Sequence, residues 1–204
     1  MRLVFASNNA HKLDEVRAMM PAGIEVLSLR DISFEAEIEE TGTTLEENSK
    51  IKAATVAAFI GERLKVKGER IDGVFADDTG LEIDALDGRP GVYTARWAGE
   101  PAANRKKALA ELKDKNDRSA QFRTVITLIK PSAISLQHSD IQVSGIVRGR
   151  IATEEYGEGG FGYDPIFIPE GYDKTFGELP AEVKNGISHR ARALQELVKV
   201  IGNW

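Results

Sequence analysis

The stretch Phe75-Ala-Asp-Asp-Thr-Gly-Leu-Glu-Ile-Asp84 sets two adjacent carboxylates behind a short apolar run. Residues 74–76 predict a buried strand, and Thr79-Gly80 predicts the point at which the chain leaves the sheet. At the carboxyl end of a strand, side chains project into the crevice where open α/β sheets bind ligands. Because successive strand residues point to opposite faces, we expect different roles for Asp77 and Asp78. One could face a metal cation while the other orients a loop or helix; an ordinary Asp-rich turn is the alternative.

The composition is that of an ordinary globular chain. Its 204 residues are 42% hydrophobic, enough for one sizeable core that a cleft could divide into two lobes. A net charge of −5 and a pI near 5.4 give no global basic field for nucleic acid, so a phosphate site must use a few placed cations. The absence of cysteine excludes disulfides, thiolate metal sites and a cysteine nucleophile. With no signal-like start and no apolar run near 18 residues, we expect a cytoplasmic protein without membrane contact.

Strands and helices are predicted to alternate along the chain. Apolar runs and stripes predict strands at 3–6, 24–29 and 165–168, and helices at 11–20, 102–115 and 188–201. Two β-rich runs, 120–129 and 134–151, predict a long antiparallel hairpin. Parallel βα units followed by such a hairpin predict an α/β fold, a mixed sheet with helices packed around it.

A further helix is predicted to begin after Thr43 or Thr44 and to end at Gly61. Its N-terminal capping box is either Thr43 with Glu46 or Thr44 with Glu47.

Two polar clusters in the first third of the sequence suit a phosphate and metal site. The backbone amides of Ser7-Asn-Asn-Ala-His-Lys12, at the start of a helix, can seat phosphate oxygens, although an ordinary loop explains them equally well. Glu39-Glu40 lies just before a helix on which Asn48 and Lys52 share a face. Together with Asp77-Asp78, these groups would suit Mg²⁺, which binds one or two carboxylates plus waters and substrate phosphates. A solvated acidic loop is the alternative.

Two clusters near the carboxyl end suit a base. Gly159-Gly-Phe-Gly-Tyr-Asp-Pro165 combines a loop open to close backbone approach with Phe161, which could stack on a base. In Lys184-Asn-Gly-Ile-Ser-His-Arg190, Ser188 is a candidate N-cap, so that two donor side chains follow in the first turn. A capped helix with basic residues on its surface is the alternative.

In combination these motifs resemble the inosine triphosphate pyrophosphatase family, also called Ham1-like, from residue 1 to the last helix. Departures are small: Ser7-Asn8-Asn9 stands where Thr-Gly-Asn is common, and Thr79 where Ser is common. The hairpin at 120–151 carries no motif of the family and is interpreted as scaffold. The motifs occur in the family's order: Ser7–Lys12, Glu39–Gly42, Asn48 with Lys52, Ala76–Gly80, Gly88–Arg96, Gly159–Pro165 and Ile187–Arg190.

The resemblance implies a Mg²⁺-dependent hydrolysis of ITP, dITP and XTP to the monophosphate and pyrophosphate. It implies metal binding by Glu39 and Asp78, with Asp78 also the catalytic proton acceptor. The implied phosphate-contacting residues are Ser7, Asn8, Asn9, Ala10, His11, Lys12, Asn48 and Lys52. The implied nucleoside-binding residues are Thr79, Phe161, Gly162, Tyr163, Asp164, Lys184, His189 and Arg190.

The resemblance also implies one domain over residues 1–204, a long twisted mixed sheet with two lobes around a central cleft, and commonly a homodimer. The implied chemistry agrees with the residues: cations neutralise the pyrophosphate while a carboxylate orients water, and no covalent nucleophile is required. A pyrophosphatase of other nucleotides such as dTTP or UTP, or a non-catalytic nucleotide-binding module, are the alternatives. Phe161, Lys184, His189 and Arg190 match the purine pattern, which argues against a pyrimidine pocket.

Overall fold

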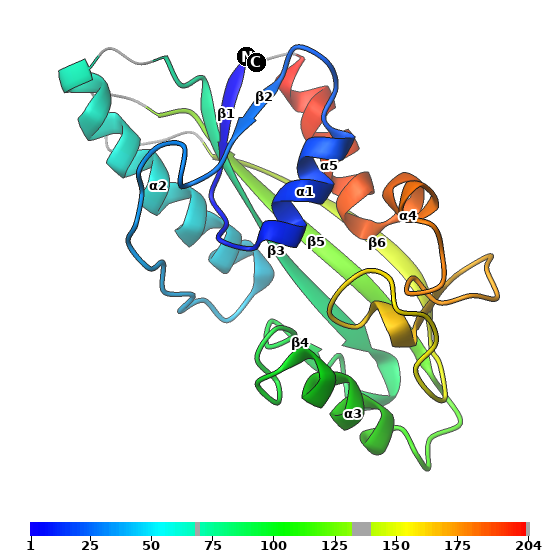
Figure 1. Cartoon of the computed structure of the whole chain (residues 1–204). Coiled ribbons are helices and arrows are strands. Elements are labelled where there is room, and N and C mark those ends of the chain that lie inside the picture. The colour runs from blue at the N-terminus through cyan, green and yellow to red at the C-terminus, as the bar shows by residue number, and fades with distance from the viewer. Residues whose placement is uncertain (68–69, 132–139, 203–204) are drawn as a thin grey trace. The chain divides into compact units, whose positions relative to one another are not determined.

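The computed structural model describes residues 1–67, 70–131 and 140–202, and Figure 1 shows its helices and strands. The strands are β1 (Arg2–Phe5), β2 (Glu25–Leu27), β3 (Gly73–Ile83), β4 (Pro90–Gly91), β5 (Ser119–Ile129), β6 (Asp140–Ile151) and β7 (Phe167–Pro169). The α-helices are α1 (Ala10–Met19), α2 (Leu45–Lys67), α3 (Pro101–Glu111), α4 (Ala181–Ile187) and α5 (His189–Ile201). Short 3-10 turns occupy Asp84–Leu86 and Asp164–Ile166.

The strands form one mixed sheet in the order β2-β1-β3-β5-β6-β7, with β4 beside β3. Strand β1 runs parallel to β2 and β3, whereas β3 with β4 and β6 with β7 are antiparallel. Ile151, the last residue of β6, donates its backbone N–H to Arg118, just before β5 begins. The ends of β5 and β6 therefore meet as in an antiparallel hairpin. This confirms the predicted α/β class with a mixed sheet; residues 134–139 of the predicted hairpin lie outside the described residues.

The chain divides into two compact units that are interleaved in sequence. Unit 1 comprises Met1–Asp78, Val125–Ser144 and Ala193–Trp204, and unit 2 comprises Thr79–Thr124 and Gly145–Arg192. The divisions fall inside β3, β5, β6 and α5, so each of these elements contributes residues to both units. Within the described part of the chain, none of the helices is both long and apolar enough to cross a membrane.

Unit 1 has helices on both faces of its strands because side chains alternate along β1 and β3. Val4 and Val74 face α2, where they join Val56 in one buried cluster. Phe5 and Phe75 point the other way, with ring centroids 5.0 Å apart, in the cluster that also holds residues of α1 and α5. Figure 1 shows α2 and α1 on opposite sides of β1.

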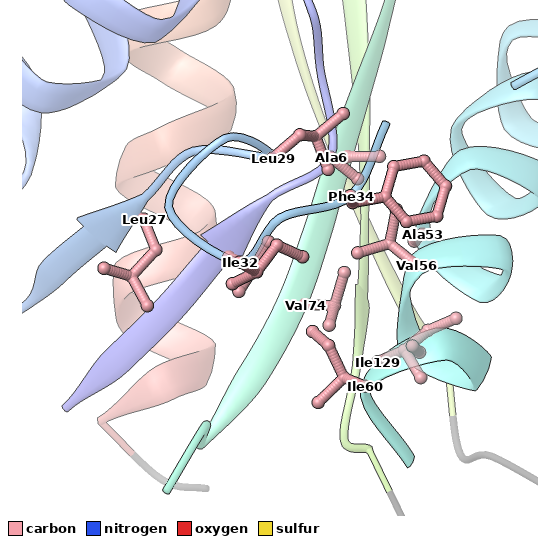
Figure 2. Close-up of a cluster of buried hydrophobic side chains, with 13 residues drawn as sticks. Ala6, Leu27, Leu29, Ile32, Phe34, Ala53, Val56, Ile60, Val74 and Ile129 are labelled. Carbon is pink, nitrogen blue, oxygen red and sulfur yellow. The ribbon is translucent and has the colours of Figure 1, made fainter. Parts of the chain in front are cut away.

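The cluster beneath α2 also includes the segment after β2. Figure 2 shows Leu29, Ile32 and Phe34 from this segment converging with α2 side chains. The ring of Phe34 meets that of Phe59 edge-on at 5.1 Å. This packing holds residues 29–34 against α2, and the chain continues from there to Glu39 and Glu40.

Unit 2 has its own core, in which aromatic rings meet around Phe167 of β7. The ring centroids of Phe122 and Phe167 lie 4.7 Å apart, and those of Phe167 and Phe176 lie 5.4 Å apart. Ala108 of α3 and Leu112, its C-cap residue, are fully buried in the same core. Helix α3 ends at Glu111 rather than at Lys115, and residues 112–114 form turns.

The start of α2 selects one of the two predicted capping boxes. The hydroxyl of Thr44 accepts the backbone N–H of Glu47 at 3.1 Å. The Glu47 carboxylate reaches one residue beyond the usual partner and accepts the N–H of Thr43 at 2.6 Å. The predicted end at Gly61 is wrong, since α2 continues to Lys67. Gly61 is buried, and a glycine inside a helix costs only about 1 kcal/mol, which packing offsets.

The prediction that the chain leaves the sheet at Thr79-Gly80 is also wrong. Strand β3 continues to Ile83, and Leu81 and Ile83 are fully buried in the core of unit 2. Strand β1 ends at Phe5, which pairs with Phe75, so β3 has no β1 neighbour at Asp77 and Asp78.

Three further boundaries differ from the predictions. Strand β2 is shorter than 24–29, because the Asp31 carboxylate accepts the backbone N–H of Ser28 and turns the chain. Helix α4 is not predicted; its N-cap is Pro180, which has no side-chain acceptor to mark a helix start. The strand predicted at 165–168 begins with a 3-10 turn and becomes β7 at Phe167.

Candidate active site

In unit 1, Asp77 and Asp78 contact different helices because they point to opposite faces of β3. Asp77 shares the face of Phe75 and accepts Lys12 Nζ of α1 at 2.9 Å. Asp78 shares the face of Ala76 and lies 3.3 Å from Lys52 Nζ of α2. Both acids are buried, at 1% and 7% exposure. This confirms the alternation inferred from sequence.

The loop before α1 is built from its own polar side chains. The Asn9 side chain caps α1 by accepting the N–H of Lys12 at 3.2 Å, and Ser7 Oγ accepts the N–H of Asn9 at 3.2 Å. The residues from Asn8 to His11 are exposed, whereas Ser7 and Lys12 are half-buried. A cation in the first turn opposes the helix dipole, and Asp77 supplies the compensating anion.

Lys52 joins two carboxylates from separate segments. Its Nζ lies 2.6 Å from Glu40 and 3.3 Å from Asp78. The loop that carries Glu40 closes onto α2 at Gly42, whose N–H is donated to Asn48 Oδ1 over 2.8 Å. A Cβ at Gly42 would lie 2.7 Å from that oxygen, so only glycine permits the approach. Glu39, the predicted metal ligand, is exposed, and its neighbour Glu40 is the acid brought to Lys52.

These groups form what we call the acid–lysine cluster: Lys12, Glu40, Lys52, Asp77 and Asp78. Burial raises the pKa of the Asp78 carboxyl, and this outweighs the attraction of Lys52 and Lys12. Burial would lower the pKa of Lys52, but Asp78, Asp77 and Glu40 more than offset it and hold that pKa above its usual value. Both shifts have one cause in common: three carboxylates face two ammonium groups, which leaves an excess of negative charge when all five are ionised.

The donor set fits a hard divalent cation that is completed by other ligands. Among the described residues, Asp78 Oδ2 and Asn48 Nδ2 are buried without a hydrogen-bond partner. A buried oxygen of this kind costs free energy unless a cation or donor meets it. The described part of the chain contains no group of three or more acidic, His or Cys side chains arranged to hold a metal alone. Mg²⁺ does not need such a cage, because it keeps waters and substrate phosphates as ligands.

In unit 2, Lys184 and Asp164 form a buried ion pair beside Phe161. Lys184 Nζ lies 2.7 Å from Asp164 Oδ2, and both residues are at most 5% exposed. The same carboxylate oxygen accepts the backbone N–H of Phe161 at 2.7 Å. Gly160, with φ of 72°, brings the loop so close that a Cβ there would collide with Asp164. The glycine-rich loop is therefore fixed by Asp164.

The ring of Phe161 lies against two cations. Lys184 Nζ is 4.8 Å and the guanidinium carbon of Arg190 is 5.7 Å from its centroid. Arg190 is itself 1% exposed, so the reading of it as a surface residue is wrong. The half-buried Phe161 ring is thus held in place by a lysine and an arginine. The family resemblance implies that all three residues bind the nucleoside.

His189 and Thr79 are joined by a residue that the sequence analysis missed. Thr124 Oγ1 lies 2.6 Å from His189 Nδ1 and 2.8 Å from Thr79 Oγ1. Arg190 Nη2 donates to Thr79 Oγ1 over 3.4 Å. Ser188 caps α5 as predicted, accepting the N–H of Ala191 at 3.1 Å. Thr124 belongs to β5, so the hairpin interpreted as scaffold contributes a side chain that contacts two of the predicted nucleoside-binding residues.

Two predicted nucleoside-binding residues, Tyr163 and Gly162, make hydrogen bonds within unit 2. Tyr163 is 3% exposed in the core of unit 2 and donates its hydroxyl to the Thr94 carbonyl over 3.0 Å. Burial raises the pKa of that hydroxyl. Gly162 offers its carbonyl to Arg105 Nη1 at 2.9 Å. Both residues contact unit 2 itself, with Gly162 half-buried.

The mixed sheet, its flanking helices and the acid–lysine cluster define an α/β protein with a buried, charged site. The model of the Ham1 family matches residues 3–200. The chain belongs to this family. A dITP/XTP pyrophosphatase of Flavobacterium johnsoniae is 46% identical, with 98% of each chain covered.

Solved structures agree with this membership. The Ham1 protein of Staphylococcus aureus is 38% identical, with a TM-score of 0.82 over 100% of this chain and 99% of that one. The HAM1 protein of Coxiella burnetii is 36% identical, with a TM-score of 0.84 over the whole of both chains.

Proposed function

We propose that this protein hydrolyses non-standard purine nucleoside triphosphates, namely ITP, dITP and XTP, to the monophosphate and pyrophosphate. It would thereby act as a hydrolase of acid anhydrides that removes these nucleotides from the pool. Family membership and the name of the F. johnsoniae relative support the substrate class. The observation that carries the proposal is Asp78, whose buried Oδ2 meets no donor among the described residues while its Oδ1 lies beside Lys52.

Unit 1 supplies the proposed phosphate and metal groups. Asp78, with Glu39 or Glu40 of the preceding loop, would hold Mg²⁺. When bound, Mg²⁺ would supply charge stabilisation to the phosphate oxygens. Lys12 and Lys52 would neutralise the leaving pyrophosphate as its charge develops. Asp78 would orient the attacking water and accept its proton, and the raised pKa of its carboxyl favours that role.

Unit 2 supplies the proposed nucleoside groups. Phe161 would stack on the base from its position against Lys184 and Arg190. Arg190 and His189 would provide hydrogen bonds to a purine that carries a carbonyl at position 6. Thr79 follows Asp78 directly on β3, so the nucleoside-binding residues begin one peptide bond after the proposed proton acceptor.

A panel of triphosphates tests this function. Purified protein with Mg²⁺ is given ITP, dITP, XTP, ATP, GTP, dTTP or UTP, and pyrophosphate release is compared with release of single phosphate. We expect pyrophosphate from the first three and at least about 100-fold less from ATP, dTTP and UTP, whereas GTP shares the carbonyl at position 6 and is not separated by that contact. Equal rates on dTTP or UTP would favour a pyrophosphatase of other nucleotides, and binding without release would favour a non-catalytic module.

The proposal extends to Mg²⁺ as the metal and to a homodimer, which the family resemblance supports, and to a cytoplasmic location, which follows from the sequence expectation above. Activity lost in EDTA and restored by Mg²⁺ tests the metal. Light scattering coupled to gel filtration tests the dimer: a mass near twice 22.3 kDa is expected. Cell fractionation with an antibody tests the location.

A further inference from the structure

Thr124 is a buried hydroxyl with two polar side chains as partners. It is fully buried on β5, 2.8 Å from Thr79 Oγ1 and 2.6 Å from His189 Nδ1. A hydroxyl has one proton and accepts through its lone pairs, so Thr124 can accept from one of these partners while it donates to the other. It therefore links β3 to the first turn of α5 within unit 2.

Arg190 favours one direction of donation along this chain of hydroxyls. A guanidinium has only donors, and Arg190 Nη2 donates to Thr79 Oγ1 over 3.4 Å. An arrangement in which Thr79 donates its O–H to Thr124, 2.8 Å away, leaves the Thr79 oxygen to accept from Arg190. Thr124 then directs its O–H to His189 Nδ1 at 2.6 Å. In this arrangement Nδ1 is an acceptor, and the ring proton is on Nε2.

The surroundings of His189 preserve this arrangement. Its ring is 4.7 Å from that of Phe122 at an angle of 30°, and the residue is 5% exposed. A neutral ring whose one nitrogen is held by Thr124 has a fixed tautomer and a fixed orientation.

We propose that Thr124 is a positioning residue for purine recognition, a role that rests on the proposed function. Its hydroxyl holds His189 as a neutral imidazole with the proton on Nε2. His189 thereby offers a hydrogen-bond donor to a carbonyl of the base. The same hydroxyl also contacts Thr79, to which Arg190 donates. Thr124 therefore connects the His189 donor with the Arg190 donor. Thr124 itself does not touch the substrate in this proposal.

Nitrogen-15 NMR of protein labelled at histidine tests the tautomer directly. We expect the His189 Nε2–H form in the unchanged protein, and a mixture of tautomers in Thr124→Val, which keeps the shape but removes the hydroxyl. In the same variant kcat/KM for ITP should fall roughly 3- to 10-fold, as expected for one lost hydrogen bond, with a smaller loss for ATP. Thr124→Ser keeps a hydroxyl and should retain both the His189 Nε2–H tautomer and the kcat/KM for ITP.

Thr127→Val is the matched control. Thr127 is also fully buried on β5, and its hydroxyl contacts Ser49 at 2.7 Å and Gln142 at 2.9 Å in unit 1. The control removes an equivalent buried hydroxyl and should leave the His189 tautomer unchanged. A His189 proton on Nδ1 in the unchanged protein, or a Thr124→Val variant with unchanged tautomer and ITP:ATP ratio, would overturn the proposal.

A second variant and a second ligand cover the cases in which Thr124→Val does not fold or ITP is not hydrolysed. If Thr124→Val does not fold, the unchanged protein and the Thr124→Ala variant provide the same comparison of tautomers. If the unchanged protein does not hydrolyse ITP, inosine monophosphate is titrated while the His189 Nε2–H resonance is observed. A shifted resonance would support purine recognition although the proposed reaction fails, and an unshifted one would overturn the role of Thr124.

Discussion

Replacing Asp78 with Asn should abolish activity and at the same time stabilise the metal-free fold. Asp78 has a pKa that burial raises above its ordinary value, even with the attraction of Lys52 and Lys12 included. Ionised Asp78 therefore costs folding free energy, by about 1.4 kcal/mol for each pKa unit between the folded and unfolded states. The neutral amide avoids this cost, and Lys52 retains Glu40 at 2.6 Å.

The sign of the pH dependence follows from the raised pKa. Between the unfolded pKa near 3.8 and the higher folded pKa, the folded state binds more protons than the unfolded state. The stability of the unchanged protein therefore falls as pH rises through this window, relative to the Asn variant, and the gap stays constant above it. Each kcal/mol of that gap raises Tm by roughly 2–4 °C in a chain of this size.

Thermal unfolding in EDTA from pH 4 to pH 8 measures the stability, and pyrophosphate release at saturating Mg²⁺ measures the activity. We expect a higher Tm for Asp78→Asn at pH 8 and a loss of turnover of roughly 100-fold or more. Mg²⁺ should raise the Tm of the unchanged protein but not that of the variant, because ligands stabilise only the state that binds them.

Asp72→Asn is a control with the opposite sign. A hydrogen bond from the Arg2 backbone N–H holds the pKa of Asp72 below its ordinary value. That variant should therefore lose stability at pH 8 and approach the unchanged protein only as pH falls through the folded pKa. Near-normal turnover by Asp78→Asn, or a lower Tm at pH 8 in EDTA, would refute the reasoning on Asp78.

Five other substitutions test the remaining assignments. Lys12→Ala and Lys52→Ala should weaken triphosphate binding by roughly 10- to 150-fold each, with little effect on the nucleoside, in titration calorimetry. Arg190→Ala should narrow the ratio of kcat/KM for ITP and ATP, mainly by lowering the value for ITP, because a 6-oxo base loses a donor. Glu40→Gln should raise the Mg²⁺ concentration needed for half-maximal rate more than Glu39→Gln does, since only Glu40 contacts Lys52.

Lys50 provides the control for the two lysine substitutions. Lys50→Ala removes a cation of α2 that pairs with Asp140 at 2.8 Å and should leave ligand binding unchanged. Equal losses for triphosphate and nucleoside would assign the lysines to the scaffold. An unchanged ITP:ATP ratio would mean that Arg190 does not read the base. A larger effect of Glu39→Gln would indicate that Glu39, rather than Glu40, binds the metal.

The sequence predicted those features that depend on neighbouring residues. Alternation along β3 separated Asp77 from Asp78, and a single hydroxyl identified Ser188 as the cap of α5. Gly80 misled the prediction, because a glycine reads as a turn although β3 carries it, buried, within the strand. Local signals of this kind cannot state whether packing overrides them.

Contacts between residues far apart in the chain could not be predicted from the sequence. Thr124 and His189 are 65 positions apart, and nothing around Thr124 marks it as polar scaffold or site. The choice of Glu40 over Glu39 as the partner of Lys52 depends on the path of one loop, which Gly42 fixes by its approach to Asn48. Both facts require the folded chain, because they are set by which elements meet rather than by residue type.

The lysines of the acid–lysine cluster are already paired, and this determines which anions the cluster can accept. A sulfate or free phosphate that took Lys12 would break its buried pair with Asp77, which is 1% exposed. Breaking a buried pair in this way costs about 3–5 kcal/mol. A triphosphate that arrives with a divalent cation returns positive charge to the carboxylates as its oxygens take the lysines. If the cluster is the proposed phosphate site, it would therefore favour an anion that brings a divalent cation over a bare anion.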